Sequence, residues 1–156
     1  MRKVLVLLLI FSLCLTGCGK KATDEPYVFD DLSIQVPADY INLSDEDFAE
    51  DLSFVFGLDP IAVNGLREEK ATFEAYGLKL DLQSYGSFVI LANNVSATLE
   101  QKDGIYTFSY VSGDFTYVVT VWETETAFWT VQAYCPNEDY GSVKGEMWEI
   151  LSSVTV

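Results

Sequence analysis

Apolar and polar residues alternate along the second half of the chain, a pattern typical of strands with one buried face. The clearest pair of such segments runs from Phe115 to Glu123 and from Ala127 to Cys135. The polar loop Thr124-Glu125-Thr126 separates them, which predicts an antiparallel hairpin. If only these loop residues are unpaired, Val121 opposes Trp129, and side chains of like character share each face. We therefore expect an antiparallel sheet built around this hairpin.

Elements on either side of the hairpin follow from changes in hydrophobic period and from turn residues. Ser44, followed by acidic residues, indicates a helix start, and Asp59-Pro60 indicates a second one. Pro37 and Pro136 end the strands that precede them. The predicted elements are a hairpin over 28–36, helices over 44–56 and 60–76, strands over 78–82 and 88–92, a hairpin joining 96–100 to 105–111, a helix over 138–151 and a last strand over 153–156.

Two stretches of the chain carry a family resemblance. One is Asp31-Leu32-Ser33-Ile34-Gln35-Val36-Pro37-Ala38-Asp39-Tyr40, and the other runs from Phe128-Trp129 through Ile150-Leu151-Ser152-Ser153-Val154-Thr155-Val156. Together with the order of elements, they resemble the PsbP-like α/β/α sandwich, which includes DcrB-like bacterial lipoproteins. The resemblance covers residues 27–156 and implies one α+β domain, an antiparallel sheet with helices on its faces. It also implies an accessory or binding role in a membrane-associated assembly, without a shared catalytic motif.

The amino-terminal residues combine positive charge, an apolar run and a cysteine. Met1-Arg2-Lys3 is followed by the apolar run from Val4 to Leu15, the layout of a secretory signal. As a helix this run rises about 18 Å, too little to cross a hydrocarbon core of about 30 Å. Leu15-Thr16-Gly17-Cys18 then resembles the box at which bacterial lipoproteins are cleaved and acylated. We expect residues 1–17 to be a signal peptide, Cys18 to carry palmitate or a similar acyl group, and residues 18–26 to form a lipidated polar tether.

Charge and composition exclude several classes of function. The 156 residues include Lys+Arg 9 and Asp+Glu 24, a net charge of -15, which disfavours nucleic acid because phosphate binding needs clustered cations. With His 0, the chain offers no histidine for a metal site or a catalytic triad. Cys135 ends the apolar face of its strand and is expected in the core rather than as a nucleophile. We therefore expect no catalysis, no cofactor and no metal.

A group of acidic residues offers an alternative to that expectation. Carboxylates of the kind that bind calcium occur at Asp45, Glu46, Asp47, Glu50 and Asp51. The group lacks the glycine and the spacing of a calcium-binding loop. Acidic residues in the first turn of a helix are also explained by the helix dipole, and we favour that interpretation.

Aromatic residues are the most prominent candidates for binding. They fall on alternate positions of three neighbouring predicted strands: Tyr106, Phe108, Tyr110, Trp122, Phe128 and Tyr134. If this face is exposed, it suits a sugar or a protein partner, whereas under helices the same residues are core. The sequence leaves both interpretations open.

The expected function is that of a membrane-anchored, extracytoplasmic, non-catalytic accessory module that binds a protein of the cell envelope. Its expected partners are the lipid bilayer, through acylated Cys18, and an envelope protein. In a cell with two membranes the outer membrane is a further location. The alternative is a lipoprotein that binds a small molecule or a glycan with the aromatic sheet face.

Overall fold

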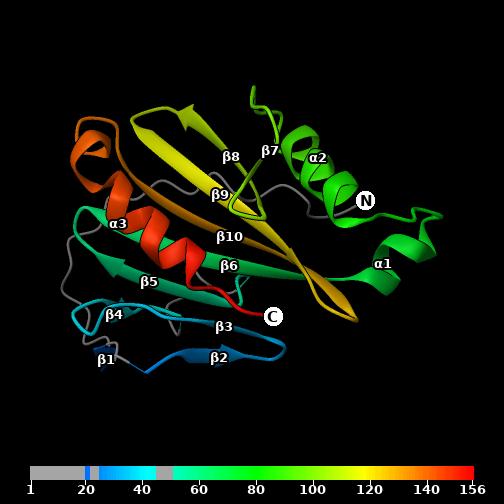
Figure 1. The fold of residues 1–156 in the computed structure, drawn as a ribbon, viewed down its shortest axis with the longest axis horizontal. Coiled ribbons are helices and arrows are strands. Elements are labelled where there is room, and N and C mark those ends of the chain that lie inside the picture. Colours follow the sequence, from blue (N-terminus) through cyan, green and yellow to red (C-terminus); the bar gives the residue numbers. More distant parts are fainter. Residues whose placement is uncertain (1–19, 22–24, 45–50) are drawn as a thin grey trace.

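An eight-stranded antiparallel sheet runs through the middle of the molecule (Figure 1). The computed structural model describes residues 20–21, 25–44 and 51–156. From one edge to the other the strands are β1 (Lys20–Lys21), β4 (Ile41–Asn42), β5 (Phe54–Leu58), β6 (Ile61–Glu69), β10 (Ala127–Pro136), β9 (Phe115–Glu123), β8 (Ile105–Ser112) and β7 (Glu100–Lys102). Lys20–Lys21, expected within a free tether, is thus paired with β4.

Helices and a small hairpin cover the two faces of this sheet. α1 (Lys70–Ala75) and α2 (Leu82–Ala92) pack on one face, here called the α2 face. α3 (Tyr140–Ser152) and the hairpin of β2 (Tyr27–Phe29) and β3 (Leu32–Ile34) pack on the other, the α3 face. The expectation of an α+β fold, an antiparallel sheet with helices on its faces, is therefore confirmed.

The core of the α3 face joins strands that lie far apart in the sequence. Phe54 of β5 and Trp129 of β10 are both fully buried, with ring centroids 6.3 Å apart. Met147 and Leu151 of α3 pack against this cluster and are also fully buried. Burial of each such side chain contributes about 1.5 to 3 kcal/mol to stability.

Gly65, in the middle of β6, allows the close approach of an aromatic ring. A Cβ atom at this position would lie 2.2 Å from Cε1 of Phe54. Glycine weakens a strand in general, but here its missing side chain is the space that the Phe54 ring fills.

The hairpin of β9 and β10 has a register that differs by one residue from the expected one. Trp129 lies opposite Trp122 rather than opposite Val121. The cause is Thr124, whose backbone N–H donates to the Ala127 carbonyl at 2.9 Å and whose Oγ1 accepts from the Ala127 N–H at 3.0 Å. Thr124 and Ala127 therefore close the turn as a pair. The shift moves every side chain of β9 to the opposite face relative to β10.

The helix expected over 44–56 is wrong where the structure describes it. Residues 45–50 lie outside the described residues, and Phe54–Leu58 forms β5. Ser44, expected as a helix cap, accepts a hydrogen bond at Oγ from the Val55 N–H at 2.9 Å. The polar side chain thus holds the chain beside a strand instead of starting a helix.

The helix expected over 60–76 is replaced for most of its length by β6. Only α1, at the end of the range, is helical. Asp59-Pro60 lies in the turn that joins β5 to β6, and such residues suit a turn as well as a helix start. The first residues of β6 are buried on both faces, so the strand lacks the alternation that would have identified it.

The strands expected over 78–82 and 88–92 are also wrong, because α2 begins at Leu82 and includes the second of them. Asp81 is the N-cap residue, and its side chain accepts from the Ser84 N–H at 2.7 Å. Tyr85 and Val89 lie one turn apart and are buried on the α2 face. The continuous apolar run from Phe88 concealed this helical period.

The remaining expectations are confirmed in outline. The hairpin over 28–36 is β2–β3, the strand over 105–111 is β8, and the helix over 138–151 is α3. The strand paired with β8 is β7, which begins at the end of the expected range 96–100. The last expected strand is reduced to a bridge, in which the backbones of Ser33 and Thr155 exchange hydrogen bonds of 2.8 and 2.9 Å.

Candidate functional site

The aromatic residues expected on one face of the sheet are divided between both faces. Trp122 packs against the core of the α3 face, and its Nε1–H donates to Thr120 Oγ1 at 3.0 Å. Phe128, by contrast, belongs to the core of the α2 face. The one-residue shift in register causes this separation, which corrects the expected grouping.

Helices cover the part of the α2 face that carries the phenylalanines. Phe128 is 1% exposed and stacks on Tyr85 of α2, with ring centroids 4.5 Å apart. Phe108 is 4% exposed in the same cluster, and Tyr106 packs against it half-buried. These residues form a core rather than an open binding surface.

A row of stacked tyrosines crosses three strands at the other end of the α2 face. Tyr110 of β8 stacks on Tyr117 of β9 at 4.7 Å, and Tyr117 stacks on Tyr134 of β10 at 5.2 Å. Burial raises the pKa of Tyr134 to about 12, so its hydroxyl is neutral at ordinary pH. Sequence analysis placed Tyr110 and Tyr134 on a common face, but it missed Tyr117 because the register was wrong.

Other predicted positions give no open site. Cys135 is 0% exposed, and burial raises the pKa of its thiol, so it belongs to the core. The described residues contain no group of three or more His, Cys, Asp and Glu side chains placed to hold a metal ion. Of the remaining candidates, Asp51 is exposed, and those outside the described residues are Cys18, Asp45, Glu46, Asp47 and Glu50.

Among the described residues, an open groove of about 720 Å³ lies along the β8 edge of the sheet and is here called the edge groove. One wall is α3, and the opposite wall is the segment of residues 96–98 that leads into β7. β8 forms the floor with Thr107 and Ser109, together with Val118 of β9. Its lining residues are Ser96, Ala97, Thr98, Glu100, Lys102, Thr107, Phe108, Ser109, Val118, Tyr140, Lys144, Gly145 and Trp148.

Two lysines give the edge groove a basic character. Lys102 of β7 places its Nζ 3.8 Å from the centroid of the Trp148 ring, a cation–π contact between the edge strand and α3. Lys144, one turn before Trp148, lies on the same wall. Glu100 is the acidic residue of the lining. The groove thus carries a local excess of positive charge in a chain of net charge -15.

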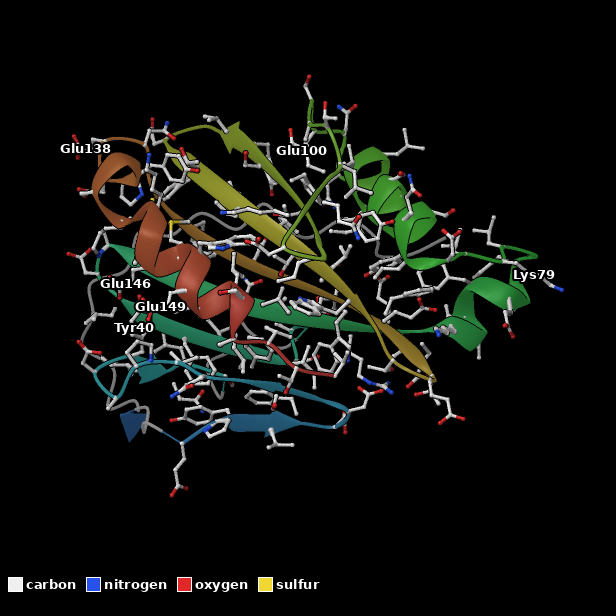
Figure 2. The ribbon with its side chains drawn as sticks, in the orientation of Figure 1. Tyr40, Lys79, Glu100, Glu138, Glu146 and Glu149 are labelled. Atoms are coloured by element: carbon white, nitrogen blue, oxygen red, sulfur yellow. The ribbon has the colours of Figure 1, made fainter. Side chains whose placement is uncertain are left out.

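The opposite flank of α3 is acidic. Figure 2 shows Glu146 and Glu149 on the side of α3 toward Tyr40, away from the β8 edge. The Tyr40 hydroxyl donates to Glu146 Oε1 at 2.9 Å, and burial together with this carboxylate raises the pKa of Tyr40 well above its usual range. α3 therefore separates its charges, with acid toward the β3 layer and base toward the edge groove.

The tip of the β2–β3 hairpin is held by a polar network centred on Asp31. Its carboxylate accepts from Arg67 Nε at 3.1 Å, from Thr124 Oγ1 at 2.5 Å and from Trp129 Nε1 at 2.8 Å. Although burial opposes it, hydrogen bonds from these residues hold the pKa of Asp31 well below its usual range. Asp31 contributed to the family resemblance, but its partners come from distant strands, and the network pins the small hairpin to the main sheet.

A second carboxylate lies beneath α2. Tyr85 donates its hydroxyl hydrogen to Glu68 Oε2 at 2.8 Å, and its oxygen lies 2.8 Å from Thr130 Oγ1. Burial raises the pKa of Glu68, and the same burial, with Glu68 nearby, raises that of Tyr85. Both groups pack between helix and sheet rather than in the edge groove, so we assign them to the structural core.

The lining of the edge groove suits binding better than bond breaking. Its hydroxyls, lysines and one carboxylate can donate and accept hydrogen bonds, and Trp148 provides an apolar contact. Among the hydroxyl groups of this lining, that of Thr107 donates to the Val119 carbonyl, and within the described chain no serine of the lining is hydrogen-bonded to a base that would activate it. Sequence analysis missed the groove, because Lys102 and Lys144 meet only through the packing of α3.

Comparison with known proteins gives a fold and no sequence family. No protein-family model matches the chain, and no curated protein matches it in sequence. The solution structure of cyanobacterial PsbP (CyanoP) from Synechocystis sp. PCC 6803 is similar, with a TM-score of 0.61 and 16% identity over 91% of this chain and 98% of that chain. A crystal structure of a protein from Bacteroides thetaiotaomicron VPI-5482 has a TM-score of 0.50 and 14% sequence identity. The match covers 88% of this chain and 48% of the Bacteroides chain.

In the described part of the chain, no helix combines the length and apolarity needed to cross a bilayer. The antiparallel sheet, its helices and these structural neighbours agree with the resemblance noted in the sequence. The chain has a PsbP-like α+β fold.

Proposed function

We propose that this protein is a lipid-anchored, extracytoplasmic, non-catalytic accessory module that binds a protein partner of the cell envelope. The observation that carries the proposal is the edge groove, an open site lined by hydrogen-bonding groups and without an activated nucleophile among its described residues. A PsbP-like fold is compatible with an accessory role, although fold alone does not determine function.

The proposed anchor rests on the amino-terminal sequence. The charged start, the apolar run and Leu15-Thr16-Gly17-Cys18 occur in the order that lipid attachment requires. Two acyl chains at Cys18 would be enough for stable membrane attachment.

Protein binding is favoured over glycan binding on the aromatic face, because the stacking surface needed for a sugar is largely occupied. Phe128 stacks on Tyr85, and Phe108 is buried in the same cluster. A sugar would have to displace α2 to reach the Phe128 ring.

The test is photo-crosslinking in cells with benzoylphenylalanine placed either at Ser109, in the edge groove, or at Leu91, which is 79% exposed on α2. We expect an envelope protein to be crosslinked from Ser109 and not from Leu91. Equal capture from both positions, or capture only from Leu91, would contradict the proposed site.

A Cys18→Ala variant tests the anchor separately. It should lose both acyl label and membrane partition, and it should lose the crosslink if binding requires the anchor. An acylated, membrane-bound Cys18→Ala protein would rule out attachment at this residue.

A further inference from the structure

The floor of the edge groove is a strand whose outer edge is only partly paired. β7 pairs with Ile105 to Thr107 of β8, where Glu100 lies opposite Thr107. Beyond that point, no strand of the described chain pairs with Phe108–Ser112 on the side away from β9. Backbone N–H and C=O groups along an open edge are a template for a further strand.

The chain leaves this edge open because the segment before β7 turns away from it. Leu99 packs into the core of the α2 face, against Gly86 of α2. Residues 96–98 therefore form a wall of the groove instead of extending β7.

The two lysines of the groove differ from the basic residues near the β2–β3 hairpin, which are engaged in ion pairs. Arg67 and Lys70 form ion pairs with Asp31, Glu69 or Glu123. In the part of the chain that the structure describes, Lys102 and Lys144 form no ion pair, and both line the groove.

We propose that the edge groove binds an extended acidic segment of the partner protein, which adds to β8 as a further strand. Its backbone pairs with Phe108–Ser112, and its carboxylates face Lys102 and Lys144. Trp148 packs against an apolar side chain of the same segment. This inference rests on the proposed function and specifies the chemistry of the partner.

A second copy of this chain fits the groove less well. Its own β8 brings no carboxylate between Phe108 and Ser112 to meet the two lysines. Two chains of net charge -15 also repel each other on approach, whereas an acidic peptide is attracted locally by the basic groove.

The probe is a fluorescein-labelled decapeptide of alternating glutamate and valine, and binding to the purified full chain in non-ionic detergent is followed by fluorescence anisotropy. A peptide with lysine in place of glutamate tests charge, and one with a central proline tests backbone pairing, since proline lacks an N–H. We expect the acidic peptide to bind at least tenfold more tightly than either control, and more weakly at high salt. Equal affinity for the acidic and lysine peptides would overturn the proposal.

Charge-reversal variants locate the binding site. Lys102→Glu and Lys144→Glu, made one at a time, should each weaken binding of the acidic peptide at least tenfold. Lys79→Glu is the matched control, because Lys79 lies near α1 and far from β7 (Figure 2), and it should change affinity less than twofold. An equal loss from Lys79→Glu would show that only net charge matters and would overturn the proposed site.

A steric variant gives an independent reading. A Cβ added at Gly145 meets no atom within 4 Å, so Gly145→Phe can fill the groove without disturbing the fold. We expect it to abolish peptide binding while the unfolding midpoint in urea changes little. Unchanged peptide affinity in this variant would contradict binding in the groove.

Amide hydrogen exchange tests strand addition itself. Bound peptide should slow exchange within Phe108–Ser112 at least tenfold and leave α2 unchanged. Binding without this protection, or the same protection from concentration-dependent dimers without peptide, would overturn the proposal. A crosslinked partner from Ser109 combined with no peptide binding would refute this inference alone, whereas peptide binding without any envelope partner in cells would refute the proposed function.

Discussion

Removal of the Asp31 carboxylate should destabilise the whole domain, because this side chain joins the β2–β3 hairpin to β6 and β10. In an Asp31→Ala variant, the indole N–H of Trp129 loses its acceptor although the residue is 0% exposed. A buried unsatisfied donor costs about 1 to 3 kcal/mol. Arg67 keeps Glu69 and Thr126 as partners, so loss of its ion pair with Asp31 adds at most about 1 kcal/mol. The expected destabilisation is therefore about 1 to 4 kcal/mol.

Urea unfolding followed by tryptophan fluorescence measures this change. For a slope of about 2 kcal/mol/M, the unfolding midpoint should fall by about 0.5 to 2 M. Asp31→Asn and Asp30→Asn form a matched pair, because both remove one charge from the same turn. Asp30 is 75% exposed and has φ 49, a conformation that asparagine tolerates, so Asp30→Asn should be nearly neutral. If Asp31→Asn and Asp30→Asn have free energies of unfolding within about 0.5 kcal/mol of each other, the network does not hold the hairpin.

The stability difference between wild type and Asp31→Asn should depend on pH. The pKa of Asp31 is lower in the folded chain than in the unfolded chain, so its stabilising effect is complete above the unfolded pKa of about 4. As pH falls below that value, the unfolded chain binds the proton first and the effect is lost. The stability difference between wild type and Asp31→Asn should therefore shrink below about pH 4. A difference that grows with acid would contradict the assignment.

Three further predictions concern the interior of the domain. Gly65→Ala should destabilise it by about 1 to 3 kcal/mol in urea, because the added Cβ would lie 2.2 Å from the Phe54 ring. Glu68→Gln should be more stable than wild type at pH 7 and similar to it at pH 4. Burial raises the pKa of Glu68, so the stability of the wild type falls as pH rises from the unfolded pKa of this carboxyl through its folded pKa. In the variant, the amide oxygen still accepts the hydrogen bond from Tyr85. Cys135 should react with N-ethylmaleimide, as measured by peptide-resolved mass spectrometry, only when the protein is unfolded, because it is 0% exposed.

Each of these predictions has its own control. Gly141→Ala places a Cβ where no atom lies within 4 Å, so it should match or exceed the stability of wild type. Glu74→Gln, at an exposed position of α1, should change the stability at pH 7 by less than about 0.5 kcal/mol, unlike Glu68→Gln. Labelling of Cys135 in the native protein as fast as in urea would show that its strand opens readily.

The sequence predicted those elements whose local pattern and tertiary environment agree. β8 combines buried and exposed positions, and α3 has an apolar side that packs on the sheet. β9 and β10 are buried along most of their length, but the polar loop 124–126 between them indicated a hairpin. The sequence pattern did not identify β6, because its first residues are buried on both faces and so do not alternate between apolar and polar.

The candidate site was less predictable than the fold, for two physical reasons. Register depended on one hydroxyl, that of Thr124, and loop length alone does not reveal which turn residues pair. The edge groove depends on tertiary packing, because Lys102 and Trp148 lie in separate elements that meet across the sheet edge. No spacing in the sequence indicates such a meeting.

The pairing of β1 with β4 sets a height above the membrane for a chain acylated at Cys18. Lys20, which pairs with Asn42, follows Cys18 by two residues, and two residues of chain span at most about 7 Å, so an acyl group attached at Cys18 would be tethered to this edge of the sheet. β8 lies six strands further across the sheet, and strands are spaced about 4.8 Å apart, which places the groove about 30 Å away (Figure 1). If the β1 edge faces the bilayer, the sheet would extend away from the membrane, and the groove would lie at the edge farthest from it. A partner then needs a stalk or a folded ectodomain that rises by this distance, and a short periplasmic or extracellular loop at the headgroups would pass beneath the site.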